Sequence, residues 1–305
     1  MEEHPMSIRY RIVSFLVKRS GMKRMFTLPK EELLRKVEKY NRKRGFWIPS
    51  SKSGRYEDIR IPPSFHCLKM SVSKGCSDKA ILFLFGGGMM IGPDAYDRKV
   101  AADMGRKSNS DVWFPYYPLC TEYSIADTYA MLFETYHRML ADYAPEAISF
   151  LGFSSGGALA IGLGLYNHQQ KESLPMPRQI IACSPGNVPQ NETEFAEAER
   201  LSQNDIMVDA AFLHDMKDIM AHGKAVPDYL ISGACGDFTG MPPIHFYYGT
   251  NETLYAAAPH FETACRLAGA PYHMHLGKGM CHCYPMFPYF PEGKIAYREI
   301  AAFLK

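Results

Sequence analysis

ISFLGFSSGGA, residues 148–158, is the stretch that decides the fold class of this chain. It contains the pattern Gly-x-Ser-x-Gly centred on Ser154, after a short apolar run and before an Ala-, Gly- and Leu-rich stretch of helical character. This context is typical of a tight strand-to-helix turn that exposes a serine hydroxyl above a sheet, where small neighbours let the backbone pack closely. We therefore predict that Ser154 is a nucleophile; the alternative is a structural serine in an ordinary turn.

Short apolar runs alternate with longer helical patterns on both sides of this stretch. Strands are predicted at residues 67–72, 80–85, 112–117, 148–151, 179–183, 244–248 and 272–276, and helices at 95–107, 125–143, 155–166, 256–267 and 294–304. Strands that alternate with helices indicate an α/β fold with a mostly parallel central sheet, covered by helices on both faces.

The first sixty residues follow a different pattern. Ile8, Ile12, Phe15 and Leu16 share one face of a predicted basic amphipathic helix, and a second helix is expected to begin near Pro29. The stretch that follows, up to residue 63, is polar and irregular. We expect the two helices to form a cap; a membrane-surface anchor and a dimer contact are the alternatives.

The expected organisation is a helical cap segment at residues 1–60 and a catalytic domain at residues 61–305. No convincing strand is found between Pro185 and Met241, so residues 186–235 are expected to be a helical insertion that completes the cap. A mostly helical insertion of this length suits a lid above the end of a sheet.

Composition narrows the choice of partners. The 34 basic and 32 acidic residues leave a formal charge of +2, which does not provide the basic field that nucleic acid binding requires. No apolar stretch is long enough for a transmembrane helix. The eight cysteines form no CxxC pair, which favours reduced thiols and a cytoplasmic location. A homodimer is possible on this evidence.

A second motif lies upstream of Ser154. The apolar residues 80–85 lead into Gly86-Gly87-Gly88-Met89-Met90. Glycines let the backbone turn and approach a substrate closely, and their N–H groups can stabilise an oxyanion. The alternative is a phosphate-binding loop, but the glycine spacing does not match G-x-G-x-x-G and no Lys-Ser/Thr pair follows.

A nucleophilic serine needs a base, and the base needs an acid to orient it. His282 is the best-placed histidine, because it follows the last predicted strand. Glu252 lies in the loop after the strand at 244–248, and Asp237 is the competing acid. The order Ser154, Glu252, His282 matches that of nucleophile-turn hydrolases. A metal at Cys281-His282-Cys283 is disfavoured, because adjacent ligands without a second pair make a poor tetrahedral site.

Three motifs together resemble the hormone-sensitive-lipase-like branch of the α/β-hydrolases, which are bacterial esterases and lipases with a helical cap. They are GFSSGG at residues 152–157, GTNETL at 249–254 and GMCHCY at 279–284; the strings at 204–207 and 241–243 are similar too. The resemblance covers most of residues 65–305. It implies the α/β-hydrolase fold and an esterase that needs no metal or organic cofactor.

By this resemblance, Ser154 is the nucleophile, His282 the base and Glu252 the orienting acid. The N–H groups of Gly87, Gly88 and Ser155 would form the oxyanion hole, and Met89, Met90 and Phe153 would contact the substrate. The chain departs from the family pattern at two positions: Phe85 replaces the histidine of H-G-G-G, and Phe153 replaces the aspartate before the nucleophile.

These features predict two-step hydrolysis of a small-molecule ester with a short to medium acyl chain. The rival hypothesis is a catalytically silent protein that binds small molecules on the same fold. Amidase, peptidase and acyltransferase activities share the acyl-enzyme intermediate, so the motifs do not separate them from an esterase.

Overall fold

A computed structural model describes residues 6–50, 54–71 and 77–305, and its centre is one eight-stranded sheet with the order β1-β2-β4-β3-β5-β6-β7-β8. The strands are β1 (Arg55–Ile61), β2 (Phe65–Ser71), β3 (Ala80–Leu84), β4 (Asp111–Tyr116), β5 (Ile148–Phe153), β6 (Gln179–Cys183), β7 (Ile244–Gly249) and β8 (Tyr272–Gly277). β1, β2 and β4 pair antiparallel, and all other neighbours pair parallel. The predicted mostly parallel sheet is therefore confirmed.

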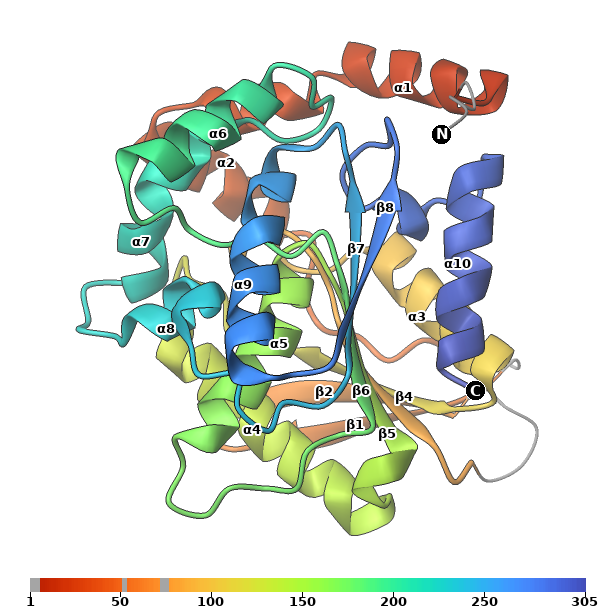
Figure 1. Ribbon diagram of the computed structural model, residues 1–305. Helices are drawn as coiled ribbons and strands as arrows, with labels where there is room; N and C mark the ends of the chain where they lie inside the picture. Colours follow the sequence, from red (N-terminus) through yellow and green to blue (C-terminus); the bar gives the residue numbers. More distant parts are fainter. Residues whose placement is uncertain (1–5, 51–53, 72–76) are drawn as a thin grey trace.

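Helices cover both faces of the sheet, with α3 and α10 on one side and α4, α5 and α9 on the other (Figure 1). The α-helices are α1 (Ile8–Ser20), α2 (Lys30–Asn41), α3 (Ala95–Ser108), α4 (Ile125–Asp142), α5 (Ser155–His168), α6 (Glu192–Ser202), α7 (Leu213–Ala221), α8 (Asp228–Ile231), α9 (Ala258–Ala268) and α10 (Pro291–Phe303). Short 3-10 turns are η1 (Met22–Thr27), η2 (Pro145–Ala147), η3 (Ala210–Phe212), η4 (Gly233–Cys235), η5 (Thr253–Ala257) and η6 (Tyr284–Met286).

Local sequence accounts for where the central helices begin. Asp94 and Asp97 form a reciprocal capping box at the start of α3, and Ser124 and Asp127 form another at the start of α4. Each box satisfies backbone N–H groups that the first helical turn leaves without partners. Strands β3, β5, β6 and β7 are fully buried, as expected for strands covered on both faces.

Strand β1 corrects the sequence analysis, which treated this stretch as irregular. Its burial pattern shows why: of its seven residues only Ile61 is buried, and Arg55, Glu57 and Arg60 are exposed, so this edge strand lacks the apolar run that marks a buried strand. The boundary proposed at residue 60 consequently falls inside β1. All seven strands that the sequence predicted are present, although the predicted end of β2 at Val72 lies outside the described residues.

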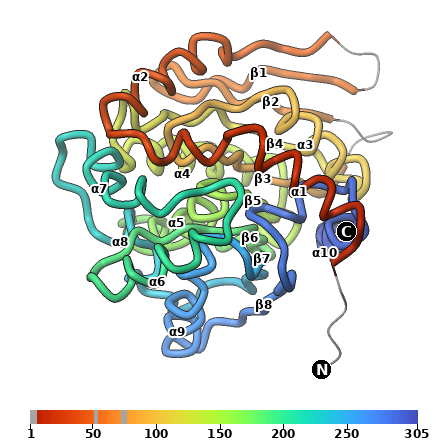
Figure 2. Tube along the Cα trace, turned by 90° about the horizontal axis from the view of Figure 1, so that it is seen from above, coloured from red at the N-terminus to blue at the C-terminus, as the bar shows by residue number. Residues whose placement is uncertain are grey.

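Helices α1, α2, α6 and α7 gather at the end of the molecule toward which the parallel strands point (Figures 1 and 2). In α2, Leu33 and Val37 are buried, as the predicted apolar face requires. In α1 the predicted face is wrong: Tyr10 is its buried residue, while Ile8 and Leu16 are exposed. The apolar periodicity there identified an outward face rather than a core-facing one.

Two further observations concern membrane-spanning helices and cysteines in the described part of the chain. Within the described residues, no helix combines the length and the apolar character needed to cross a bilayer. The seven cysteines in the described part of the chain are all free thiols, and Cys76 lies outside it.

Candidate active site

Ser154 occupies the tight turn between β5 and α5, with φ 56° and ψ −126°. This conformation is costly for a non-glycine residue, and its neighbours maintain it. A Cβ atom on Gly152 would lie 2.0 Å from the carbonyl oxygen of Gly156, and one on Gly156 would lie 2.1 Å from that of Leu84. Gly156 therefore lets the start of α5 pack directly against strand β3, Gly152 lets β5 pack against the start of α5, and the serine is lifted above the sheet.

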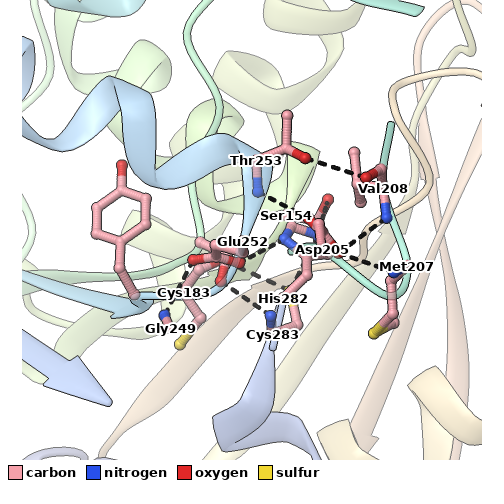
Figure 3. Close-up of polar contacts among 12 residues, drawn as sticks. Ser154, Cys183, Asp205, Met207, Val208, Gly249, Glu252, Thr253, His282 and Cys283 are labelled. Atoms are coloured by element: carbon pink, nitrogen blue, oxygen red, sulfur yellow. Dashed lines mark hydrogen bonds and ion pairs between the residues drawn. The ribbon is translucent and has the colours of Figure 1, made fainter. Parts of the chain in front are cut away.

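Ser154, His282 and Glu252 form one continuous chain of hydrogen bonds (Figure 3). The Oγ atom of Ser154 lies 2.9 Å from Nε2 of His282, and Nδ1 of His282 lies 2.7 Å from Oε2 of Glu252. These residues follow β5, β8 and β7, whose carboxyl ends meet at the same edge of the sheet. The parallel topology therefore brings together side chains that are up to 128 positions apart.

Burial and mutual contact shift the pKa values of Glu252 and His282. Glu252 is fully buried; burial raises the pKa of its carboxyl, and the hydrogen bond from His282 opposes that rise. Burial lowers the pKa of His282, but contacts with Cys283 and Glu252 outweigh it, so the pKa lies well above the ordinary 6.5. The contacts with Cys283 and Glu252 thus favour the protonated form of the imidazole, and the Glu252 carboxyl also accepts a hydrogen bond from the Gly249 N–H.

The glycine loop presents free backbone donors beside Ser154. Among the described residues, the N–H groups of Gly87, Gly88 and Ser155 donate to no acceptor. Gly87 has φ +124°, and a Cβ atom there would lie 2.3 Å from the carbonyl oxygen of Ile91, so only glycine fits. Because Ser155 begins α5, its N–H is one of those a helix cannot satisfy internally. Such donors are suited to a developing negative charge.

An aromatic stack braces the glycine loop at Phe85, the position for which the sequence resemblance implied a histidine. The ring of Phe85 lies 4.1 Å from that of Tyr117 and nearly parallel to it, and the two rings are fully or almost fully buried. The Tyr117 hydroxyl donates a 2.7 Å hydrogen bond to the Phe85 carbonyl. The tyrosine hydroxyl therefore holds the backbone at the start of the loop, so the end of the strand is anchored with Phe85 at this position.

Asp205 is a buried acid that the sequence analysis did not recognise as part of the site. One oxygen accepts hydrogen bonds from the N–H groups of Met207 and Val208, and the other accepts one from the N–H of Thr253 (Figure 3). It thereby ties the insertion to the loop that carries Glu252. Its place in the string at 204–207 was the available signal. Asp237, the competing acid, is exposed and caps the N–H of Thr239 instead.

Two cavities meet at Ser154. The larger, of about 720 Å³, is lined by His282, Phe153, Gly87 and residues of η1. The smaller, of about 60 Å³, is lined by Ser155, Met89 and apolar side chains of α7, namely Leu213, Met216 and Met220. Gly88 lines both, and the larger volume is typical of a site for a small molecule.

Two of the three residues predicted to contact the substrate line these cavities. Phe153 lines the larger and Met89 the smaller. Met90 lines neither: it is fully buried, and its carbonyl accepts a hydrogen bond from the Asn41 side chain. Both ring nitrogens of His282 form hydrogen bonds, with Ser154 and Glu252, and no three His, Cys, Asp or Glu side chains among the described residues gather in a way that could hold a metal ion.

Comparison with known proteins places this geometry in context. The family described as "alpha/beta hydrolase fold" matches residues 81–286. The chain is 27% identical to an esterase of Acinetobacter venetianus over 76% of each chain. It is 26% identical to an acetyl-hydrolase of Streptomyces hygroscopicus over 82% of this chain and 85% of that one. A solved esterase from the bacterial hormone-sensitive lipase family superposes with a TM-score of 0.80 at 22% identity, covering 99% and 98% of the two chains. The comparisons agree with the resemblance that the sequence motifs indicated.

Proposed function

Because this chain belongs to the α/β-hydrolase fold family, we propose that it hydrolyses carboxylic esters through an acyl-enzyme on Ser154. The observation that carries the proposal is the continuous hydrogen-bonded chain from Ser154 through His282 to Glu252, next to three unpaired backbone donors. Relatives that are named esterase and acetyl-hydrolase support the same reaction class.

The proposed reaction has two steps. His282 takes the proton of Ser154 as its oxygen attacks the ester carbonyl, and the N–H groups of Gly87, Gly88 and Ser155 stabilise the oxyanion. His282 then donates that proton to the leaving alcohol. In the second step, water gives a proton to His282 and attacks the acyl-enzyme, and His282 returns the proton to Ser154 as the acid leaves. Glu252 stabilises the imidazolium in both steps. The chemistry proceeds with these protein groups alone.

The test of this function is covalent labelling with a fluorophosphonate, which reacts with activated serines. We expect one adduct per chain by intact mass, and peptide mapping should place it on Ser154. Absence of an adduct on the folded protein would contradict an activated nucleophile and favour the silent binding protein.

The larger cavity is proposed to hold the leaving group, and the smaller one the acyl group. His282 must donate its proton to the leaving oxygen, so the alcohol portion has to lie on the side of His282, which lines only the larger cavity. The smaller cavity, of about 60 Å³, has about one twelfth of the 720 Å³ volume of the larger one. The substrate is therefore an ester with a short acyl chain and a larger alcohol.

Acyl length should consequently be restricted much more strongly than alcohol size. We expect kcat/KM for p-nitrophenyl esters to fall at least about tenfold between butyrate and octanoate, because the pocket cannot contain the added methylenes. Met216→Ala removes a wall of the smaller cavity and should shift the preference toward longer chains. Met25→Ala, which alters the larger cavity, is the matched control and should leave the acyl preference unchanged. An equal response of both variants would contradict the assignment.

The pH dependence should show an acid limb above pH 6.5. Catalysis requires neutral His282, and the raised pKa of this residue means that it remains protonated below that value. Activity is therefore lost as pH falls through the raised pKa. The measurement is kcat/KM between about pH 5 and about pH 10, which reports the pKa of the free enzyme. An acid limb with its midpoint below 6.5 would show that the Glu252 and Cys283 contacts do not hold the proton.

The sequence analysis expected a cap from residues 1–60 and 186–235; since β1 belongs to the sheet, we propose that residues 6–50 and 186–235 supply a cap over the cavities. Met25 and Phe26 of η1 line the larger cavity, and Leu213 of α7 lines the smaller one. Lys23 forms an ion pair with Asp209, which joins the two parts of the cap at a distance of 3.4 Å. The outer wall of the substrate site is therefore built by these two segments.

A further inference from the structure

Exposed apolar side chains are concentrated in the first part of the chain. Of the fourteen large hydrophobic residues that are exposed in the described chain, nine lie between Met6 and Ile48. Scattered exposed apolar residues are normal on a protein surface, whereas a concentration of them indicates a contact with something else. The strongest part of this concentration lies on α1.

Helix α1 has two apolar faces, and only one of them contacts the protein. Tyr10, Val13 and Val17 pack toward the core. Ile8, Ile12, Phe15 and Leu16 fall within an arc of about 100° on the opposite side, at 100° per residue, and are 75%, 56%, 56% and 60% exposed. We name these four residues the outward face. Such a face on a surface helix has no function in folding the body that lies beneath it.

The outward face is held in this orientation by contacts at the start of the helix. The backbone N–H and the hydroxyl of Ser7 both donate to the Glu292 carboxylate, at 2.7 and 2.8 Å. The Tyr10 ring makes an edge contact with Phe290 at 5.0 Å. Both partners belong to the start of α10, so α1 is attached to the main domain beside this helix (Figure 1), and its outward face stays exposed.

The charge of this region identifies the kind of partner. Residues 1–44 contain thirteen Lys and Arg against five Asp and Glu, a formal charge of +8, whereas the remaining residues have a formal charge of −6. Arg9, Arg11, Lys18 and Arg19 of α1 are exposed and form no ion pair with any residue in the described part of the chain. Apolar residues bordered by cations are typical of helices that lie in the surface of an anionic bilayer.

We propose that α1 binds an anionic membrane surface, with the outward face among the acyl chains and Arg9, Arg11 and Lys18 beside it at the level of the lipid headgroups. Arg19, whose guanidinium lies over the Phe15 ring, reaches the same headgroups from the end of the helix. A second copy of the chain is disfavoured as the occupant, because it would bring two segments of charge +8 together. At thirteen residues, α1 is too short to span a bilayer, so the attachment is peripheral. Ser20, Gly21 and Met22, at the end of α1, line the larger cavity, so its mouth would lie next to the lipid surface. This proposal does not depend on the proposed catalytic function.

The test is flotation of the full chain with vesicles. One preparation contains phosphatidylcholine with about 30% phosphatidylserine, and the other contains phosphatidylcholine alone. We expect at least about tenfold stronger partitioning onto the anionic vesicles, and a marked decrease as salt is raised. Ile12→Gln/Leu16→Gln should lower partitioning at least about tenfold, because binding scales with the buried apolar area. Arg9→Gln/Arg11→Gln should lower it separately.

Leu267→Gln is the matched control, since Leu267 is 78% exposed at the end of α9, far from α1. It should partition like the wild type. Ile12 and Leu16 line neither cavity, so labelling by fluorophosphonate and the thermal unfolding temperature should be unchanged in every variant. Three results would overturn the proposal: no binding to anionic vesicles, equal binding by wild type and Ile12→Gln/Leu16→Gln, or a wild-type dimer that this double variant abolishes in the absence of vesicle binding. The last result would assign the outward face to a second copy.

Discussion

Ser154→Ala is expected to lower kcat for a short p-nitrophenyl ester by at least about 10⁴-fold, with little change in KM. The variant removes the hydroxyl that is hydrogen-bonded to Nε2 of His282, so no acyl-enzyme can form. Binding and the backbone donors remain, which is why a small residual rate above that in water is expected. The measurement is steady-state kinetics, with intact mass to show that the variant preparation contains no wild-type protein.

Ser155→Ala provides the control next to it. The Ser155 hydroxyl is buried and has no hydrogen-bond partner among the described residues, and its proposed contribution is made by its backbone N–H. Alanine retains that N–H, so kcat should stay within about threefold of the wild type. Comparable losses in the two variants would show that disturbing the turn, rather than removing the nucleophile, abolishes activity.

Glu252→Gln is expected to lower kcat by about 10³- to 10⁴-fold while KM changes little. Glutamine has nearly the same shape, but it carries no charge to stabilise the imidazolium, and it can present an N–H group to Nδ1 of His282. The wrong tautomer would then leave Nε2 protonated and unable to accept the proton of Ser154. Because Glu252 is fully buried and 2.7 Å from the histidine, water cannot replace it.

Asp237→Asn is the matched control for this experiment, because Asp237 was the competing acid in the sequence. Its side chain is exposed and accepts a hydrogen bond from the N–H of Thr239. The variant should therefore keep kcat within about threefold of the wild type and leave the unfolding temperature nearly unchanged. A large effect of Asp237→Asn together with a small effect of Glu252→Gln would reverse the assignment of the acid.

The positions of the strands could be predicted where burial leaves a clear local pattern. Strands β3, β5, β6 and β7 are buried on both faces and appear as continuous apolar runs between turn residues. Strand β1 lies at the edge of the sheet and is held mainly by backbone pairing with β2. Backbone hydrogen bonds do not constrain side-chain type, so its residues carry no comparable signal.

The same limit applies to the first helix. The spacing of Ile8, Ile12, Phe15 and Leu16 correctly predicted a helix with an apolar face. Which face contacts the protein depends on the surface that the rest of the chain offers, and Phe290 and Glu292 provide it for the opposite side. Periodicity therefore identifies an apolar face but not its partner.

The sequence by itself determined the fold family, the strained turn at Ser154, and the serine, histidine and acid of the proposed catalytic site. These features depend on short motifs whose backbone requirements are local. Tertiary structure decided the rest: that Glu252 rather than Asp237 reaches His282, that Tyr117 and Asp205 hold the two loops of the site, and that two cavities of unequal size meet at the serine. These features depend on contacts between residues far apart in the chain. Parallel pairing aligns the ends of β5, β7 and β8 and so brings Ser154, Glu252 and His282 within hydrogen-bonding distance, while the insertion brings Asp205 to Thr253.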